Sequence, residues 1–148
     1  MPQSLANVLV HLVYSTKDRA PCLTREVRQV LFPYASGVLR NMQCPLLQIG
    51  GIEDHLHMLI RLPRTMTLAQ VVEKTKTSTS KWLKTRGLHD FAWQSGYGAF
   101  SIGTDQTERT VSYIQTQEEH HHTISFQDEL RGLMREAGIE LDERYVWD

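Results

Sequence analysis

The order of apolar patterns along the chain constrains the fold more than any other feature of the sequence. Short apolar or β-branched runs, typical of buried strands, occupy residues 7–14, 46–53, 55–62 and 97–103. Longer patterns, with apolar residues every three to four positions, follow the first and third runs and predict helices. The order strand, helix, strand, strand, helix, strand is that of a ferredoxin-like split β-α-β domain. We therefore predict an α+β fold, a four-stranded antiparallel sheet with helices on one face.

Capping and breaking residues mark the limits of these helices. Thr24 and Thr67 can each cap a helix N-terminus, and Gly87 can end the second helix. Pro33 lies inside the first helical pattern and should kink or divide it, because proline has no backbone N–H to donate. The glycine pair at 50–51 suggests a bulge or a tight bend in the second strand.

Two further helices are predicted after the fourth strand, as additions to the split β-α-β order. Asp105 and Glu108 have a capping-box-like spacing at the start of a helix that carries VSYIQTQEEHH. Ser125 starts a last helix, which ends before Gly138.

Size and composition predict one globular domain, residues 1–148, of which 41% are hydrophobic and 22% charged. No apolar run approaches the roughly 20 residues that span a bilayer, and the N-terminus has no signal-type segment. We therefore expect a cytoplasmic protein with no membrane partner. Cys22 and Cys44 lack the spacing of a disulfide framework or a metal site and receive no role.

Basic residues gather in one segment of a chain whose net charge is only -1. That net charge argues against nonspecific coating of duplex DNA, which relies on broad neutralisation of phosphates. The segment 74–89 contains no acidic residue, and a solvated helix face explains its charges as well as a phosphate-binding surface does. The candidate DNA-binding side chains are Lys74, Lys76, Lys81, Lys84 and Arg86.

The motif His55-Leu56-His57 lies in the third predicted strand, where successive side chains alternate between the faces of the sheet. Both imidazoles therefore project from the same face and can bind one metal ion, and Asp54 could orient one of the rings. Taken alone, such a pair is more often a core or surface pair than a metal site.

Tyr113 and Gln117 are four residues apart in a predicted helix, so a hydroxyl and an amide oxygen can reach one point. Taken alone, this spacing more often belongs to a tyrosine packed on the core beside an exposed glutamine. The residues that follow, 118–122, offer more titratable groups, but most are expected to form a solvated helix end, where cationic histidine suits the helix dipole.

Together these motifs resemble the HUH transposases that use a single tyrosine to move small insertion sequences as single-stranded DNA. The similar segments are HLVYSTKDR, DHLHML, the basic helix, FAWQSGYGAFSIG, YIQTQEEHH and DERYVWD, in that order. The resemblance spans essentially the whole chain, and the two motifs together are far more specific than either one. Thr116 departs from the pattern, since many relatives have Asn before the Gln, but this position is not a catalytic one.

The resemblance implies roles for four residues: Tyr113 matches the nucleophile, and His55, His57 and Gln117 match the metal ligands. It implies a metal-dependent transposase that cleaves and rejoins single-stranded DNA at hairpin-bearing element ends through a 5′-phosphotyrosine. It also implies Mg²⁺ or Mn²⁺ as the ion, and a homodimer in which the tyrosine helix of one subunit can complete the histidine site of the other.

Elementary chemistry agrees with these roles. A phenol with a pKa near ~10 needs help to act as a nucleophile at neutral pH. A cation at the scissile phosphate can polarise its oxygens and stabilise the leaving 3′ oxygen. Because one phosphodiester replaces another, a different 3′-OH can reverse the step without ATP. Two imidazoles, an amide oxygen and waters form a ligand set that suits Mg²⁺ or Mn²⁺ better than Zn²⁺, because a dedicated zinc site generally has a complete set of His, Cys or carboxylate ligands.

Three other hypotheses stay open at this point. A domesticated relative would process palindromic repeats of a host genome instead of mobilising its own element. A non-catalytic ferredoxin-like module would bind single strands without forming a covalent adduct. A metal-dependent phosphodiesterase would use water as the nucleophile and leave Tyr113 a structural role.

Overall fold

A computed structural model describes residues 3–147, and its four strands and first two helices follow the predicted order along the chain. The strands are β1 (Leu9–Ser15), β2 (Leu46–Ile52), β3 (His55–Arg61) and β4 (Gly98–Ile102). Antiparallel pairing arranges them as β2-β3-β1-β4. The prediction of an α+β fold with a four-stranded antiparallel sheet is therefore confirmed.

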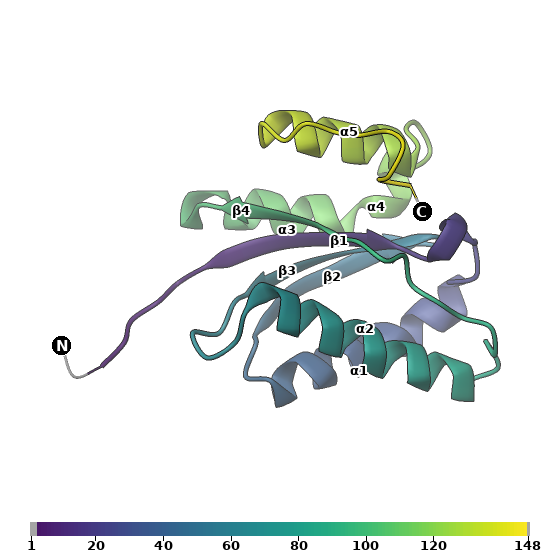
Figure 1. The fold of residues 1–148 in the computed structure, drawn as a ribbon, viewed down its shortest axis with the longest axis horizontal. Coiled ribbons are helices and arrows are strands. Elements are labelled where there is room, and N and C mark those ends of the chain that lie inside the picture. The colour runs from purple at the N-terminus through teal and green to yellow at the C-terminus, as the bar shows by residue number, and fades with distance from the viewer. Residues whose placement is uncertain (1–2, 148) are drawn as a thin grey trace.

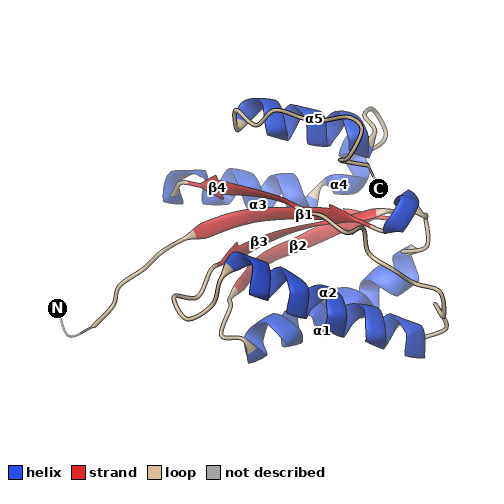
Figure 2. Ribbon diagram, in the orientation of Figure 1, coloured by secondary structure: helices blue, strands red, loops and turns tan. Residues whose placement is uncertain are grey.

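Helices cover both faces of this sheet (Figure 1, Figure 2). On one face lie α1 (Arg25–Asn41) and α2 (Leu68–Thr85), the two helices of the split β-α-β order. The added helices lie on the other face and are α3 (Thr107–Gln115), α4 (Gln117–His120) and α5 (Phe126–Glu136). No helix within residues 3–147 is long and apolar enough to cross a membrane.

Alternation along β1 and β3 separates a large apolar core from a smaller, histidine-bearing face. Even-numbered residues of both strands enter the large core with the apolar sides of α1 and α2: Val10, Leu12, Tyr14, Leu56, Met58 and Ile60. Odd-numbered residues point toward the added helices. Among them, Leu9 and Leu59 pack on Ile114 of α3, whereas Val13 packs with Phe126 of α5. The same face receives the histidines of both strands.

The structure refines the limits of two predicted helices. Pro33 was expected to kink or divide the first of them; it does not divide α1, which continues to Asn41, and Gln29, four residues earlier, is exposed to water. The helix predicted from Asp105 begins at Thr107, and it is broken into α3 and α4 at Thr116. That break redirects the chain just before Gln117.

The glycine pair of β2 does not form a bulge; it lies where α3 approaches the strand closely. The irregularity in the β2–β3 register lies between Leu46 and Gln48, which corrects the prediction of a bulge at the glycines. A Cβ atom on Gly50 would collide with the backbone carbonyl of Ile114, so α3 can lie against β2 only because this position has no side chain.

Candidate active site

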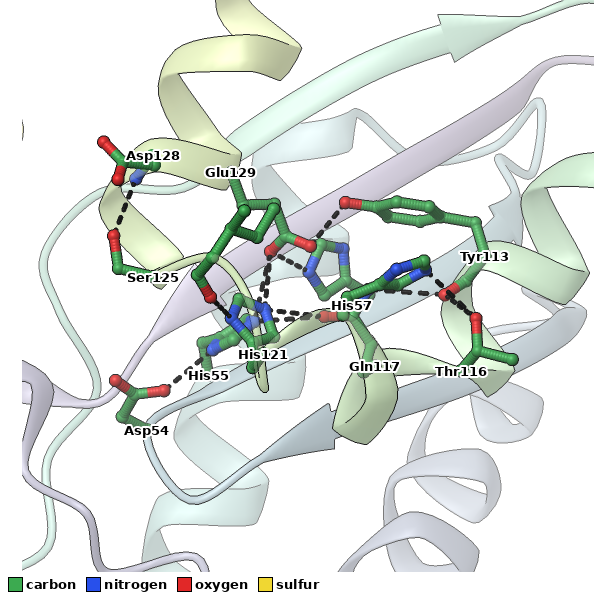
Figure 3. Close-up of polar contacts among 12 residues, drawn as sticks. Asp54, His55, His57, Tyr113, Thr116, Gln117, His121, Ser125, Asp128 and Glu129 are labelled. Atoms are coloured by element: carbon green, nitrogen blue, oxygen red, sulfur yellow. Dashed lines mark hydrogen bonds and ion pairs between the residues drawn. The ribbon is translucent and has the colours of Figure 1, made fainter.

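The four residues expected at the site meet on the face covered by the added helices, within one chain (Figure 3). His55 Nε2 lies 3.3 Å from Gln117 Oε1, and the Gln117 amide donates to the backbone carbonyl of Tyr113 at 3.4 Å. The ring centroids of His57 and Tyr113 are 5.7 Å apart. Both imidazoles are 0% exposed and Gln117 is 1% exposed, so these polar groups are held inside the protein.

A carboxylate from α5 lies at the centre of this group. Glu129 Oε1 is 2.8 Å from Nε2 of His57 and 3.3 Å from Nε2 of His55. Its other oxygen, Oε2, accepts a hydrogen bond from the Tyr113 hydroxyl. Figure 3 shows the side chain reaching from α5 toward the imidazoles.

Sequence patterns did not predict Glu129, because an acidic residue in the first turn of a helix is ordinarily a solvated partner of the helix dipole. A signal was present nonetheless. Phe126 and Leu130 are buried and mark the apolar side of α5, and position 129 falls on that same side. A glutamate there must be buried, and it is only 4% exposed.

His121 is the second site residue that was not predicted. Its Nε2 lies 3.2 Å from both Gln117 Oε1 and Glu129 Oε1, and its Nδ1 lies 2.8 Å from the carbonyl oxygen of Ile124. Most of residues 118–122 were expected to form a solvated helix end, and residues 118, 119 and 122 are exposed, whereas the His121 side chain is buried. The turn that follows the break at Thr116 brings this ring inward.

Neighbouring side chains fix the orientation of the two strand histidines. His55 Nδ1 lies 2.8 Å from Asp54 Oδ1, which confirms the expected contact, and His57 Nδ1 lies 2.8 Å from His11 Nε2. In both rings Nδ1 is thereby engaged. Nε2 of His55 faces the Gln117 and Glu129 oxygens, and Nε2 of His57 faces Glu129.

Burial controls the protonation of these groups. It lowers the pKa of His11 to about 3 and that of His57 to about 4, so both are neutral near pH 7. Burial alone would raise the pKa of Glu129, but hydrogen bonds to His121, His55 and His57 outweigh it and hold that pKa well below its usual range. Burial and the hydrogen bond to Glu129 raise the pKa of the Tyr113 phenol far above its ordinary value, so the phenol keeps its proton.

The donor atoms of the site fit a divalent cation. His55, His121 and Glu129 bring their ligand atoms within 4.8 Å of one another, and the Gln117 amide oxygen contacts two of these atoms. Imidazole nitrogens with carboxylate and amide oxygens are a ligand set for divalent metals. The buried cluster is thus a candidate metal centre next to a tyrosine hydroxyl.

Comparison with known proteins places the chain in a family. Residues 4–117 match the model of the family Transposase IS200 like. The chain is an IS200-like transposase. The match ends at Gln117, so α5 and Glu129 lie beyond it.

Two solved structures resemble the transposase in fold. A protein of Deinococcus radiodurans R1 that is assigned to the transposases has a TM-score of 0.64 and 17% identity, over 77% of this chain and 93% of that one. A REP-associated tyrosine transposase bound to a REP hairpin has a TM-score of 0.63 and 17% identity, over 82% of this chain and 73% of that one. No curated protein matches the chain.

A cleft of about 610 Å³ leads to the nucleophile candidate of the transposase. Residues of β4, α3 and α5 line it, and Tyr113 and Glu129 form part of its wall. Arg109 lines the same cleft and can meet a phosphate there. The site is therefore buried but has an opening of the size that binds small molecules or a segment of a polymer.

The basic residues of the transposase do not join the site, because α2 lies on the opposite face of the sheet (Figure 1). Lys76 donates hydrogen bonds to the backbone carbonyls of Gln94 and Gly96, at 2.8 and 2.6 Å, and holds the segment before β4. The other four candidates are exposed: Lys74, Lys81, Lys84 and Arg86.

Proposed function

We propose that this transposase cleaves and rejoins single-stranded DNA through a covalent bond between Tyr113 and a 5′ phosphate. A divalent cation, Mg²⁺ or Mn²⁺, is held by His55, His57 and Gln117. One observation carries the proposal: the Tyr113 hydroxyl, two strand imidazoles and the Gln117 amide oxygen converge on one buried region of a family member.

The reaction exchanges one phosphodiester for another. The Tyr113 oxygen attacks the phosphorus as the phenol loses its proton, the bond to the 3′ oxygen breaks and this oxygen takes up a proton to leave as a 3′-OH, and the 5′ phosphate stays on the tyrosine as an ester. A 3′-OH from another strand reverses the step and joins new ends. The cation, when bound, supplies Lewis acidity to the phosphate oxygens and to the leaving 3′ oxygen.

The chain's own groups manage the phenolic proton. Because the pKa of Tyr113 is raised by burial and by its hydrogen bond, the phenol must lose its proton as the oxygen–phosphorus bond forms. Glu129 Oε2 accepts that hydrogen bond and is therefore the acceptor in position. Stacking on His120, at a centroid distance of 4.6 Å, holds the ring from the other side.

DNA with a hairpin is the proposed partner, and it uses both faces of the sheet. The single strand enters the cleft beside Tyr113, while the exposed basic residues of α2 hold hairpin phosphates on the opposite face. Tyr113 lies at the histidines of its own chain, so we propose that the tyrosine acts within one subunit. The homodimer that the family resemblance implies stays a prediction.

A labelled hairpin with single-stranded flanks, incubated with Mg²⁺ or Mn²⁺ and run on a denaturing gel, tests the proposal. We expect a protein-linked 5′ fragment that is lost in Tyr113→Phe and after EDTA treatment. Tyr145→Phe is the matched control, because Tyr145 is 72% exposed and lies outside the site. That variant should form the adduct as the unaltered protein does.

Each alternative gives a different gel. Hydrolysed fragments without an adduct, unaffected by Tyr113→Phe, would show a phosphodiesterase that uses water. Retarded but uncut DNA would show a binding module. Adduct formation on host palindromes but not on hairpins that flank the gene would favour a domesticated, repeat-processing relative.

A further inference from the structure

We propose that Glu129 and His121, both outside the segment that matches the family, are additional metal ligands. Glu129 Oε1 and His121 Nε2 join His55, His57 and Gln117 around the cation, while Glu129 Oε2 positions the Tyr113 hydroxyl. The inference rests on the proposed function, because it assigns further ligands to the same site. It makes α5 part of the active centre and not merely a cover over the sheet.

The spacing of four donor atoms supports this ligand set. Glu129 Oε1 lies 3.3 Å from His55 Nε2 and 3.2 Å from His121 Nε2. Gln117 Oε1 lies 3.3 and 3.2 Å from the same two nitrogens. The four atoms thus form a closed ring in which nitrogen and oxygen alternate.

The size of this ring matches a metal ion. The point equidistant from four atoms spaced in this way lies about 2.0–2.3 Å from each of them, depending on how far the four depart from one plane. Metal–ligand bonds to Mg²⁺ or Zn²⁺ are about 2.0–2.2 Å long. His57 Nε2 contacts Glu129 Oε1 at 2.8 Å and so borders the same point.

Charge gives an independent reason for a cation here. The ligands inferred from the sequence are two imidazoles and an amide, and none of these groups brings a negative charge to balance a cation. Glu129 adds a carboxylate that is 4% exposed and, within residues 3–147, has polar contacts with His55, His57, His121 and Tyr113 but with no lysine or arginine. Positive charge stabilises a buried carboxylate, and a divalent cation bound at the centre of these atoms would supply more of it than a protonated imidazole does.

The fold holds Glu129 in place from a distance. Phe126 and Leu130 flank it on α5 and pack on Val13 of β1 and Phe100 of β4. Ser125 caps the helix by accepting from the Asp128 amide at 3.1 Å. Because this packing and the Ser125 cap hold α5 in place, the Glu129 carboxylate can contact the cation and the tyrosine together.

Binding of Mn²⁺ to the full chain, measured without DNA by calorimetry and by the electron paramagnetic resonance of free Mn²⁺, tests the inference. Glu129→Gln keeps the shape of the side chain but removes its charge, and we expect it to weaken Mn²⁺ binding at least tenfold. His121→Asn should weaken binding in the same direction. Glu119→Gln, an exposed glutamate in α4, is the matched control and should bind Mn²⁺ normally. Circular dichroism checks that each variant is folded.

The outcomes separate this inference from the proposed function. Unchanged Mn²⁺ affinity in both folded variants, Glu129→Gln and His121→Asn, overturns the inference even where the unaltered protein forms its DNA adduct. A folded unaltered protein that binds no Mn²⁺ overturns it as well. Loss of affinity in Glu129→Gln, in a protein that forms no adduct with any hairpin, keeps the ligand set and rejects the proposed reaction.

Discussion

The sheet's two faces receive side chains from the same two strands, yet they are built for different purposes. Beneath α1 and α2, the residues of β1 and β3 are apolar and join one large core. Beneath α3, α4 and α5, the same strands present His11, His55 and His57. His55 and His57 contact polar groups of α4 and α5, and His11 contacts His57. Neighbouring residues of β3 therefore have opposite environments: one side chain lies in the apolar core and the next lies in a cluster of titratable groups.

This difference explains how a small domain can hold a buried polar site. The hydrophobic effect acts mainly on the α1 and α2 face, so most of the stability comes from residues that do not carry the chemistry. The opposite face has smaller apolar clusters, and these anchor α3 and α5 on either side of the histidines. If this division is correct, substitutions on the two faces should have separable effects on stability and on function.

The largest loss of stability should come from truncating Leu56, which lies between the two site histidines but points into the large core. Leu56→Ala should lower the free energy of unfolding by about 2–5 kcal/mol, because it removes buried hydrocarbon and leaves a cavity. Urea denaturation measures the change. His57→Ala, the comparison on the other face, should cost less stability but abolish adduct formation; equal destabilisation by the two variants would contradict the division.

The fold was predictable because its determinants are local. Thr24 and Thr67 cap their helices as expected, accepting from the amides of Val27 and Gln70, and alternation in the strands sets which residues are buried. Pro33 was expected to kink or divide α1, and it does not divide the helix; Gln29, four residues earlier, is exposed, so water can bond to the backbone group that loses its donor.

The site was predictable only in part. His55 and His57 are two residues apart in a strand, and Tyr113 and Gln117 are four apart, so short spacings predicted their geometry. The packing of α5 on strands that are distant in sequence brings Glu129 to the site, and the helix break at Thr116 brings His121 there. No local spacing specifies either contact.

Acid should destabilise the metal-free protein through the histidine face. In the unfolded chain histidine has a pKa near ~6.5, whereas the folded values are about 3 for His11 and about 4 for His57. Below pH ~6.5 the unfolded state therefore binds more protons than the folded state. As the pH is lowered, the free energy of unfolding decreases by about 1.4 kcal/mol per pH unit for each ring. His55 does not oppose this, because its pKa is raised by its carboxylate partners and it is protonated in both states there.

The expected loss is roughly 3 kcal/mol between pH 6.5 and 5. Denaturation at a series of pH values measures the slope. In His11→Asn about half of the slope should disappear, because one of the two neutral rings is gone; an unchanged slope would show that these buried rings are not neutral.

Substituting Gly50 should disturb the histidine face from the edge of the sheet. In Gly50→Ala the added Cβ meets the backbone carbonyl of Ile114, so α3 must move away from β2. We expect a loss of roughly 1–3 kcal/mol in stability, as for other overpacked sites, and slower adduct formation, because Tyr113 lies on α3 and moves with it. Gly37→Ala is the control, since a Cβ at Gly37 meets nothing within 4 Å. Normal adduct formation in Gly50→Ala would show that the site tolerates a shifted α3.

The smallest effect on stability should come from the exposed lysines of α2, which lie on the core side but take no part in the core. Lys81→Ala combined with Lys84→Ala should leave unfolding and Mn²⁺ binding unchanged, because neither side chain reaches the histidine face. Affinity for hairpin DNA should fall, and the slope of log affinity against log salt should decrease by about 0.9 for each duplex phosphate contact that is lost. Lys17→Ala, an exposed lysine outside α2, should leave the slope unchanged. If the double variant also kept its slope, the hairpin would have to bind elsewhere, and the α2 face would be left with the core as its one role.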